Sequence, residues 1–142
     1  MGKPKGIKPR LLVYTAHARR RAPKSSMRIV NETRDRLLAE RAEIATKAFE
    51  RMKGLLGRDG LGRGAALVIE PCTSIHTLFM RFPISVLFVD EEGFVLAAHD
   101  RMVPWRLSRF HGRARCVVEL PAGTLSSTGT EVGDRLLFVH EP

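Results

Sequence analysis

The stretch PCTSIHTLFMRFPISVLFVD, residues 71–90, decides how the rest of the chain is organised. Residues 86–89 form a continuous apolar run, which is typical of a strand covered on both faces. Pro83 has no backbone N–H to donate, so a strand that passes it must break, bulge or lie at a sheet edge. The turn signal at 90–93 and the apolar segment 94–98 predict a β-hairpin that begins in this stretch.

The first half of the stretch holds polar and sulfur-containing side chains that could do chemistry. If residues 72–80 are extended, their side chains alternate, and Cys72, His76 and Met80 share one face. Four residues of strand span roughly 13 Å, so a Cys72–His76 contact needs a bend or a helical turn. A nucleophilic Cys–His dyad would need that contact and a third group to orient the ring. The alternative is that Cys72 and Met80 fill core while His76 bonds to backbone.

Three further residues are candidates for the same site. Glu119 lies in an apolar strand, where an inward carboxylate would need a partner such as Arg81. Trp105, the only tryptophan, lies on a predicted loop and could be a ligand platform or could fold over the core. We expect His76, Arg81 and Glu119 to approach one pocket, with Met80 packed beneath them.

Length and composition fit a single globular domain, with 142 residues of which 44% are hydrophobic and 27% charged. The formal net charge of +9 suggests a nucleic-acid binder, but the excess of positive charge lies mainly in one segment. Residues 1–26 hold eight Lys or Arg and no acid, which leaves sixteen basic and fifteen acidic residues in 27–142. We expect 1–26 to be a basic disordered tail, a targeting segment or a non-native extension, dispensable for folding. Nucleic acid would be bound only through this tail.

The two cysteines have no paired spacing, which argues against both a disulfide framework and a zinc-finger site. No run reaches the ~20 apolar residues of a membrane span. We therefore expect a soluble, cytoplasmic protein with no membrane contact, no metal and no cofactor. The oligomeric state stays open.

Four blocks of the sequence resemble the conserved blocks of domain-of-unknown-function family 192: GLLGR at 54–58, IHTLFMRFPI at 75–84, VVELPAG at 117–123 and GDRL at 133–136. The resemblance covers roughly residues 27–139. That family is uncharacterised in function, so the resemblance implies a fold and almost no chemistry. It places strands near 28–31 and 36–44. One position departs from the family, which usually carries an acidic residue where this chain has Ser85.

Apolar residues at helical spacing predict one amphipathic helix over about 46–56, begun by Thr46 and ended by Gly57. The glycine-rich segment 57–64 could cradle a phosphate, but a plain helix-to-strand connection fits it better. The remaining pattern predicts a β-rich α+β fold, a single compact barrel-like sheet closed or plugged by that helix. Its last elements are strands at 65–69, 115–120 and 135–140, and one helical turn within 124–130.

Two classes of function remain open for residues 27–142, which we expect to form one domain. The first is a small binding module with a pocket for a small polar ligand or a peptide. The second is a hydrolase-type enzyme that uses His76 with Cys72 or Glu119. Titratable groups that converge in a concave pocket would favour the enzyme, and a shallow apolar groove would favour binding. The candidate pocket residues are His76, Met80, Arg81, Trp105 and Glu119, with Cys72 as the candidate nucleophile.

Overall fold

In the computed structural model, which describes residues 27–47 and 53–140, the expected hairpin is formed by β4 (Ile84–Val89) and β5 (Val95–Met102). All six residues of β4 are buried. The reason is that β4 is paired on both edges, with β5 and with β6 (Cys116–Pro121), and is covered on both faces. The other strands are β1 (Met27–Asn31), β2 (Arg36–Ala45), β3 (Ala65–Ile69) and β7 (Leu136–His140).

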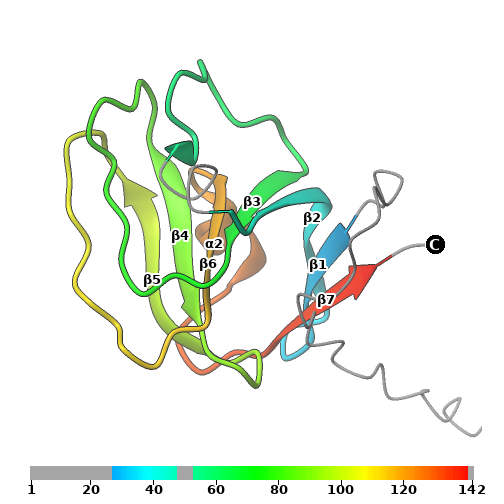
Figure 1. The fold of residues 1–142 in the computed structure, drawn as a ribbon. Helices are drawn as coiled ribbons and strands as arrows, with labels where there is room; N and C mark the ends of the chain where they lie inside the picture. The colour runs from blue at the N-terminus through cyan, green and yellow to red at the C-terminus, as the bar shows by residue number, and fades with distance from the viewer. Residues whose placement is uncertain (1–26, 48–52, 141–142) are drawn as a thin grey trace, which may run out of the picture.

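The seven strands form one curled, half-barrel sheet in the order β5-β4-β6-β3-β2-β1-β7 (Figure 1). β2 and β3 are parallel, and every other neighbouring pair is antiparallel. The β-rich fold with a barrel-like sheet is therefore confirmed. The strands predicted from apolar patterning and from the family resemblance lie where they were expected, with ends that differ by at most four residues.

Side chains alternate across the sheet, so the core consists of two apolar clusters, one on each face. In β4, Leu87 belongs to the first cluster and Phe88 to the second. In β6, Val118 belongs to the first cluster and Val117 to the second. Glu119 has the parity of Val117 in the same strand, so its carboxylate enters the second cluster.

α2 (Thr124–Thr128) is the expected single helical turn, and the Asp100 carboxylate of β5 accepts hydrogen bonds from its Leu125 and Ser126 backbone N–H groups at 2.9 and 3.2 Å. Of the amphipathic helix expected at about 46–56, residues 48–52 lie outside the described residues, residue 53 is helical, and residues 46–47 and 54–56 are not helical. The basic segment 1–26 also lies outside the described residues. Within the described part of the chain, no helix is both long and apolar enough to cross a bilayer.

Residues 70–83 do not form the extended strand that the sequence suggested for 72–80. They form an irregular loop whose one ladder contact is an isolated bridge between His76 and Leu107. Pro83 comes directly before β4, so its missing N–H interrupts no ladder. The alternation of side chains between two faces, expected for residues 72–80, is therefore wrong. The conformation of the loop determines where these side chains lie.

Candidate functional site

Glu119 is a buried carboxylate in the middle of the sheet. It lies in β6, opposite Leu67 of β3 and Val86 of β4, and only 3% of its surface is exposed. Its Oε2 atom is buried and accepts no hydrogen bond. Burial raises the pKa of Glu119 to about 7, and the positive charge of Arg58 offsets this only in part. A carboxylate in this state is partly protonated at neutral pH.

Glu119 lines a cavity of about 440 Å³. One wall of the cavity comes from the loop before β4, which contributes Cys72, His76 and Met80. Another part of the lining comes from the segment 53–56. The structure therefore brings four of the six residues proposed from the sequence to one cavity.

Cys72 is half-buried, and its thiol donates a hydrogen bond to the Ser74 carbonyl oxygen at 3.1 Å. A nucleophilic dyad would instead direct the thiol proton to an imidazole nitrogen. His76 is exposed, and its backbone pairs with Leu107. Cys72 and His76 thus share the cavity wall, while the thiol proton is directed to the backbone.

Arg81 and Trp105 do not line this cavity. The guanidinium of Arg81 contacts the exposed carboxylate of Asp59 at 2.6 Å, so the expected Arg81–Glu119 pair is wrong. The loop turns at Phe79, whose φ is 63°, and Arg81 lies beyond that turn with its side chain 66% exposed. Trp105 is 56% exposed and packs against the Phe79 ring at a centroid distance of 4.6 Å.

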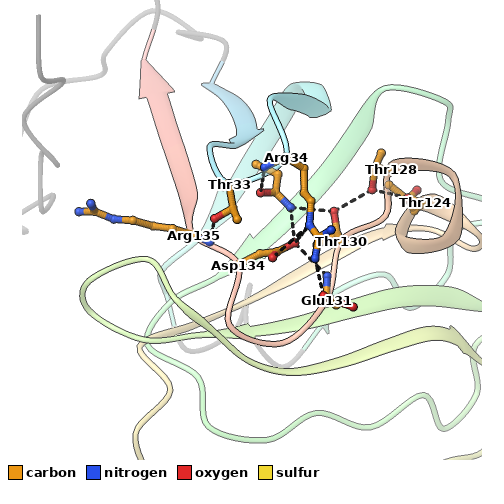
Figure 2. Close-up of polar contacts among 9 residues, drawn as sticks. Thr33, Arg34, Thr124, Thr128, Thr130, Glu131, Asp134 and Arg135 are labelled. Carbon is orange, nitrogen blue, oxygen red and sulfur yellow. Dashed lines mark hydrogen bonds and ion pairs between the residues drawn. The ribbon is translucent and has the colours of Figure 1, made fainter. Parts of the chain in front are cut away.

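A second polar cluster, which sequence reasoning missed, lies between the β1–β2 turn and the loop before β7 (Figure 2). Asn31 is fully buried and donates to Thr130 Oγ1 at 3.0 Å and to Asp134 Oδ2 at 2.9 Å. The guanidinium of Arg34 contacts both Asp134 and Glu131. Burial raises the pKa of Asp134, but hydrogen bonds from Arg34 and Asn31 outweigh this effect and hold the pKa below its ordinary value.

Because each of these buried groups has partners, we interpret this cluster as structural. Asp134 also shapes a turn, since its Oδ2 atom accepts a hydrogen bond from the Glu131 N–H at 3.1 Å. It also joins two distant turns. The available sequence signal was Asn31, a polar residue that shares the buried face of β1 with Met27 and Ile29.

The sequence matches the model of the DUF192 family, described as an uncharacterised ACR, over residues 29–138. The chain belongs to the DUF192 family. A UPF0127 protein of Pyrococcus horikoshii is 32% identical over 113 residues, which are 76% of this chain and 96% of that protein. A UPF0127 protein of Thermococcus sibiricus is 29% identical over 112 residues, covering 76% of this chain and 72% of that protein.

Two solved structures share the fold. One is a Novosphingobium aromaticivorans protein of unknown function, with a TM-score of 0.68 and 21% identity, covering 78% of this chain and 82% of its own. The other, from Sinorhizobium meliloti, carries the name of a transcription regulator and has a TM-score of 0.68 and 24% identity, covering 82% and 94%. At these identities the likeness shows the fold alone.

Ser85, the position at which the family resemblance implied an acidic residue, is fully buried in β4. Its hydroxyl donates to the Asp100 carbonyl oxygen at 2.6 Å and lies 3.2 Å from Asp100 Oδ1. A carboxylate is therefore present beside this position, supplied by the neighbouring strand. The Asp100 carboxylate already accepts hydrogen bonds from the backbone at the start of α2. We therefore interpret the contact between Ser85 and Asp100 as structural.

Neither cysteine forms a disulfide. Cys116 is buried in the first core cluster, on the face of β6 opposite Glu119, and burial raises the pKa of its thiol to about 12. Among residues 27–47 and 53–140, no three His, Cys, Asp or Glu side chains are close enough together to hold a metal ion.

Proposed function

We propose that this DUF192 chain is a small binding module whose cavity takes a small polar ligand or a peptide segment. The ligand presents a hydrogen-bond donor or a cationic group to Glu119. The observation that carries this proposal is the buried Oε2 atom of Glu119, which has no hydrogen-bond partner and belongs to a residue that lines the cavity.

The energetic argument concerns the missing partner. Buried polar atoms in folded proteins nearly always have a hydrogen-bond partner, and an orphaned one costs about 1–3 kcal/mol or more when it is charged. A ligand that donates to Glu119 would recover this cost on binding. The cavity volume of about 440 Å³ is within the range of small-molecule sites.

The origin of the cavity wall gives a second line of support. Three of the four blocks that resemble the family contribute to it: the block at 54–58 through Leu55 and Leu56, the block at 75–84 through Ile75, His76 and Met80, and the block at 117–123 through Glu119. The fourth block contains Asp134 and belongs to the structural cluster of Figure 2.

The test is a thermal-shift panel at pH 8, where most Glu119 side chains would be ionised. The panel contains primary amines, guanidines and dipeptides with a free amino terminus. A member present at a hundredfold excess over its Kd should stabilise the fold by about 2.7 kcal/mol, raising Tm by roughly 5–10 °C. Glu119→Gln should abolish the shift for amines and guanidines, because a neutral amide offers a cation far less than a carboxylate does.

The matched control is Glu43→Gln, which removes a carboxylate that is 68% exposed and lies near the cavity, paired with Arg58. This variant should keep the full shift. The proposal is wrong if no compound stabilises the native chain, or if the Glu119→Gln and native chains respond equally.

A hydrolase is the second candidate, favoured by one observation. Glu119, with a pKa of about 7, shares its cavity with His76 and Cys72, and a general base works best when its pKa is near the working pH. Glu119 would then activate a water molecule for attack on an ester or amide. A panel of chromogenic esters and amides should show turnover that falls about 100-fold or more in Glu119→Gln. Loss in Cys72→Ala instead would assign the nucleophile to the thiol.

A further inference from the structure

Four large apolar side chains, each more than half exposed, lie on two neighbouring loops and do not line the cavity. They are Phe79 on the loop before β4, and Trp105, Leu107 and Phe110 on the loop between β5 and β6, with exposed fractions of 69%, 56%, 73% and 74%. We call these four residues the loop patch. In Figure 1 the loop between β5 and β6 (yellow) runs along the outer edge of the molecule.

The loop patch is held in a fixed arrangement. Thr77, which is fully buried, donates its hydroxyl proton to the Val103 carbonyl oxygen at 2.7 Å and accepts at its own carbonyl oxygen from the Trp105 N–H at 2.9 Å. Phe79 and Trp105 have φ angles of 63° and 66°, a region that non-glycine residues rarely adopt. Backbone strain of this kind persists only where surrounding contacts impose it, and it is common at functional surfaces.

The chain segment that carries Trp105, Leu107 and Phe110 is rich in positive charge. Residues 101–118 contain five arginines and no acidic residue, although 27–142 as a whole has sixteen basic and fifteen acidic residues. Four of the five are exposed and form no ion pair within the part of the chain that the structure describes: Arg101, Arg106, Arg109 and Arg113. Two copies of this chain would bring like charges together, which disfavours self-association through the patch. An anionic partner fits.

We propose that the loop patch binds the surface of an anionic lipid bilayer. Tryptophan, phenylalanine and leucine side chains are those that enter the headgroup and upper acyl region, while arginines bind the lipid phosphates around them. The sequence suggested no membrane contact because no run is long enough to span. A peripheral contact through loops needs no such run.

The composition of the patch favours a bilayer over single-stranded nucleic acid. Bases stack on open aromatic faces, but the Phe79 and Trp105 rings pack against each other at 4.6 Å. Leu107, among the most exposed side chains of the patch, has no ring to offer a base. A bilayer interface takes aliphatic and aromatic side chains alike.

Trp105 is the only tryptophan of the chain, so its fluorescence reports on the patch alone. The full-length protein is mixed with phosphatidylcholine vesicles that contain about 30% phosphatidylserine, an anionic lipid of cytoplasmic leaflets. Trp105 emission should shift to shorter wavelength and should be quenched by lipids that carry a doxyl group near the headgroup. Pure phosphatidylcholine vesicles should give a much weaker effect.

Two variants separate the patch from the rest of the chain. Leu107→Ser with Phe110→Ser keeps Trp105 and should lower the vesicle partition coefficient by about tenfold or more. Arg106→Gln with Arg109→Gln should lower it by about fivefold per arginine, and more so at low salt. Val132→Ser and Arg63→Gln, at exposed positions outside the patch, should leave it unchanged. Thermal unfolding verifies that each variant is folded.

The basic segment 1–26 is present in every variant and could attract anionic vesicles by charge alone. Binding through that segment would leave the partition coefficients of both patch variants equal to those of the controls, and Trp105 would not be quenched by doxyl lipids. Either result overturns the proposal. So does quenching of Trp105 by an oligothymidylate when doxyl lipids have no effect, because that result would assign the patch to nucleic acid.

Discussion

At the scale of single residues, Glu119 combines two conditions that rarely occur together. It lies in a central strand, where both neighbouring strands exclude water, and its Oε2 atom has no partner. Between pH 4.5 and about 7, the folded protein therefore holds a proton on Glu119 that the unfolded chain would release. The ordinary pKa of 4.5 rises to about 7, which corresponds to about 3 kcal/mol.

The first prediction follows from the sign of this shift. Between pH 4.5 and about 7 the unfolded chain binds fewer protons at this position than the folded chain. The free energy of unfolding should therefore fall as pH rises, with about 3 kcal/mol lost from this group by pH 8. Glu119→Gln, which cannot ionise, should lose this pH dependence and should be more stable than the native chain at pH 8. Urea unfolding at pH 5 and pH 8 measures both.

Glu43→Gln is the control for that experiment, because an exposed carboxylate contributes little to the free energy of unfolding. An unchanged pH dependence in Glu119→Gln would mean that Glu119 is solvated or paired in solution. The apolar pattern around Glu119 indicated from sequence that it could face inward. It could not show that Arg81 turns away, because the partner of a surface arginine depends on a loop turn at Phe79 that has no apolar periodicity.

At the scale of elements, hydrogen-bonded side chains determine how the turns are joined. The β1–β2 turn and the loop before β7 are about a hundred residues apart in sequence and are joined through Asn31, Arg34 and Asp134 (Figure 2). The side chain of Asp134 is 4% exposed, whereas that of Glu131 is 70% exposed, although both contact Arg34. This pair allows a matched comparison.

The second prediction compares these two carboxylates. Asp134→Asn should destabilise the fold by about 2–3 kcal/mol, because the charge-assisted bond to Arg34 is lost and buried donors lose an acceptor. Glu131→Gln should cost about 0.5 kcal/mol or less, since it removes an exposed ion pair. Equal effects of the two substitutions in urea unfolding would contradict the role given to the buried cluster.

The elements themselves were largely predictable, and the loop between β3 and β4 was not. Strands such as β4 and β6 have apolar patterns that local spacing reveals. The loop containing His76 and Thr77 is shaped by hydrogen bonds to residues near 103–106, far away in sequence. No local pattern encodes such partners, so the extended conformation expected for 72–80 was wrong.

At the scale of the whole molecule, the cavity and the polar cluster of Figure 2 lie at different parts of one curled sheet. The second core cluster opens into the cavity beside Glu119, and the polar cluster of Figure 2 lies between the β1–β2 turn and the loop before β7. The fold class was predictable from the spacing of apolar residues and the family resemblance. The cavity was only partly predictable, because strand alternation places Glu119 on a face but does not reveal that its partner is missing.

The protonation state of Glu119 is the most direct test of this account. Protein labelled with ¹³C at glutamate side-chain carboxyl carbons is titrated from pH 3 to pH 9 by NMR, and Glu119→Gln identifies the Glu119 signal. We predict that this carbon titrates with a pKa of about 7, whereas exposed glutamates titrate near their ordinary value of 4.5. A Glu119 pKa at or below 4.5 would show a solvated or paired carboxylate and would contradict the central claim.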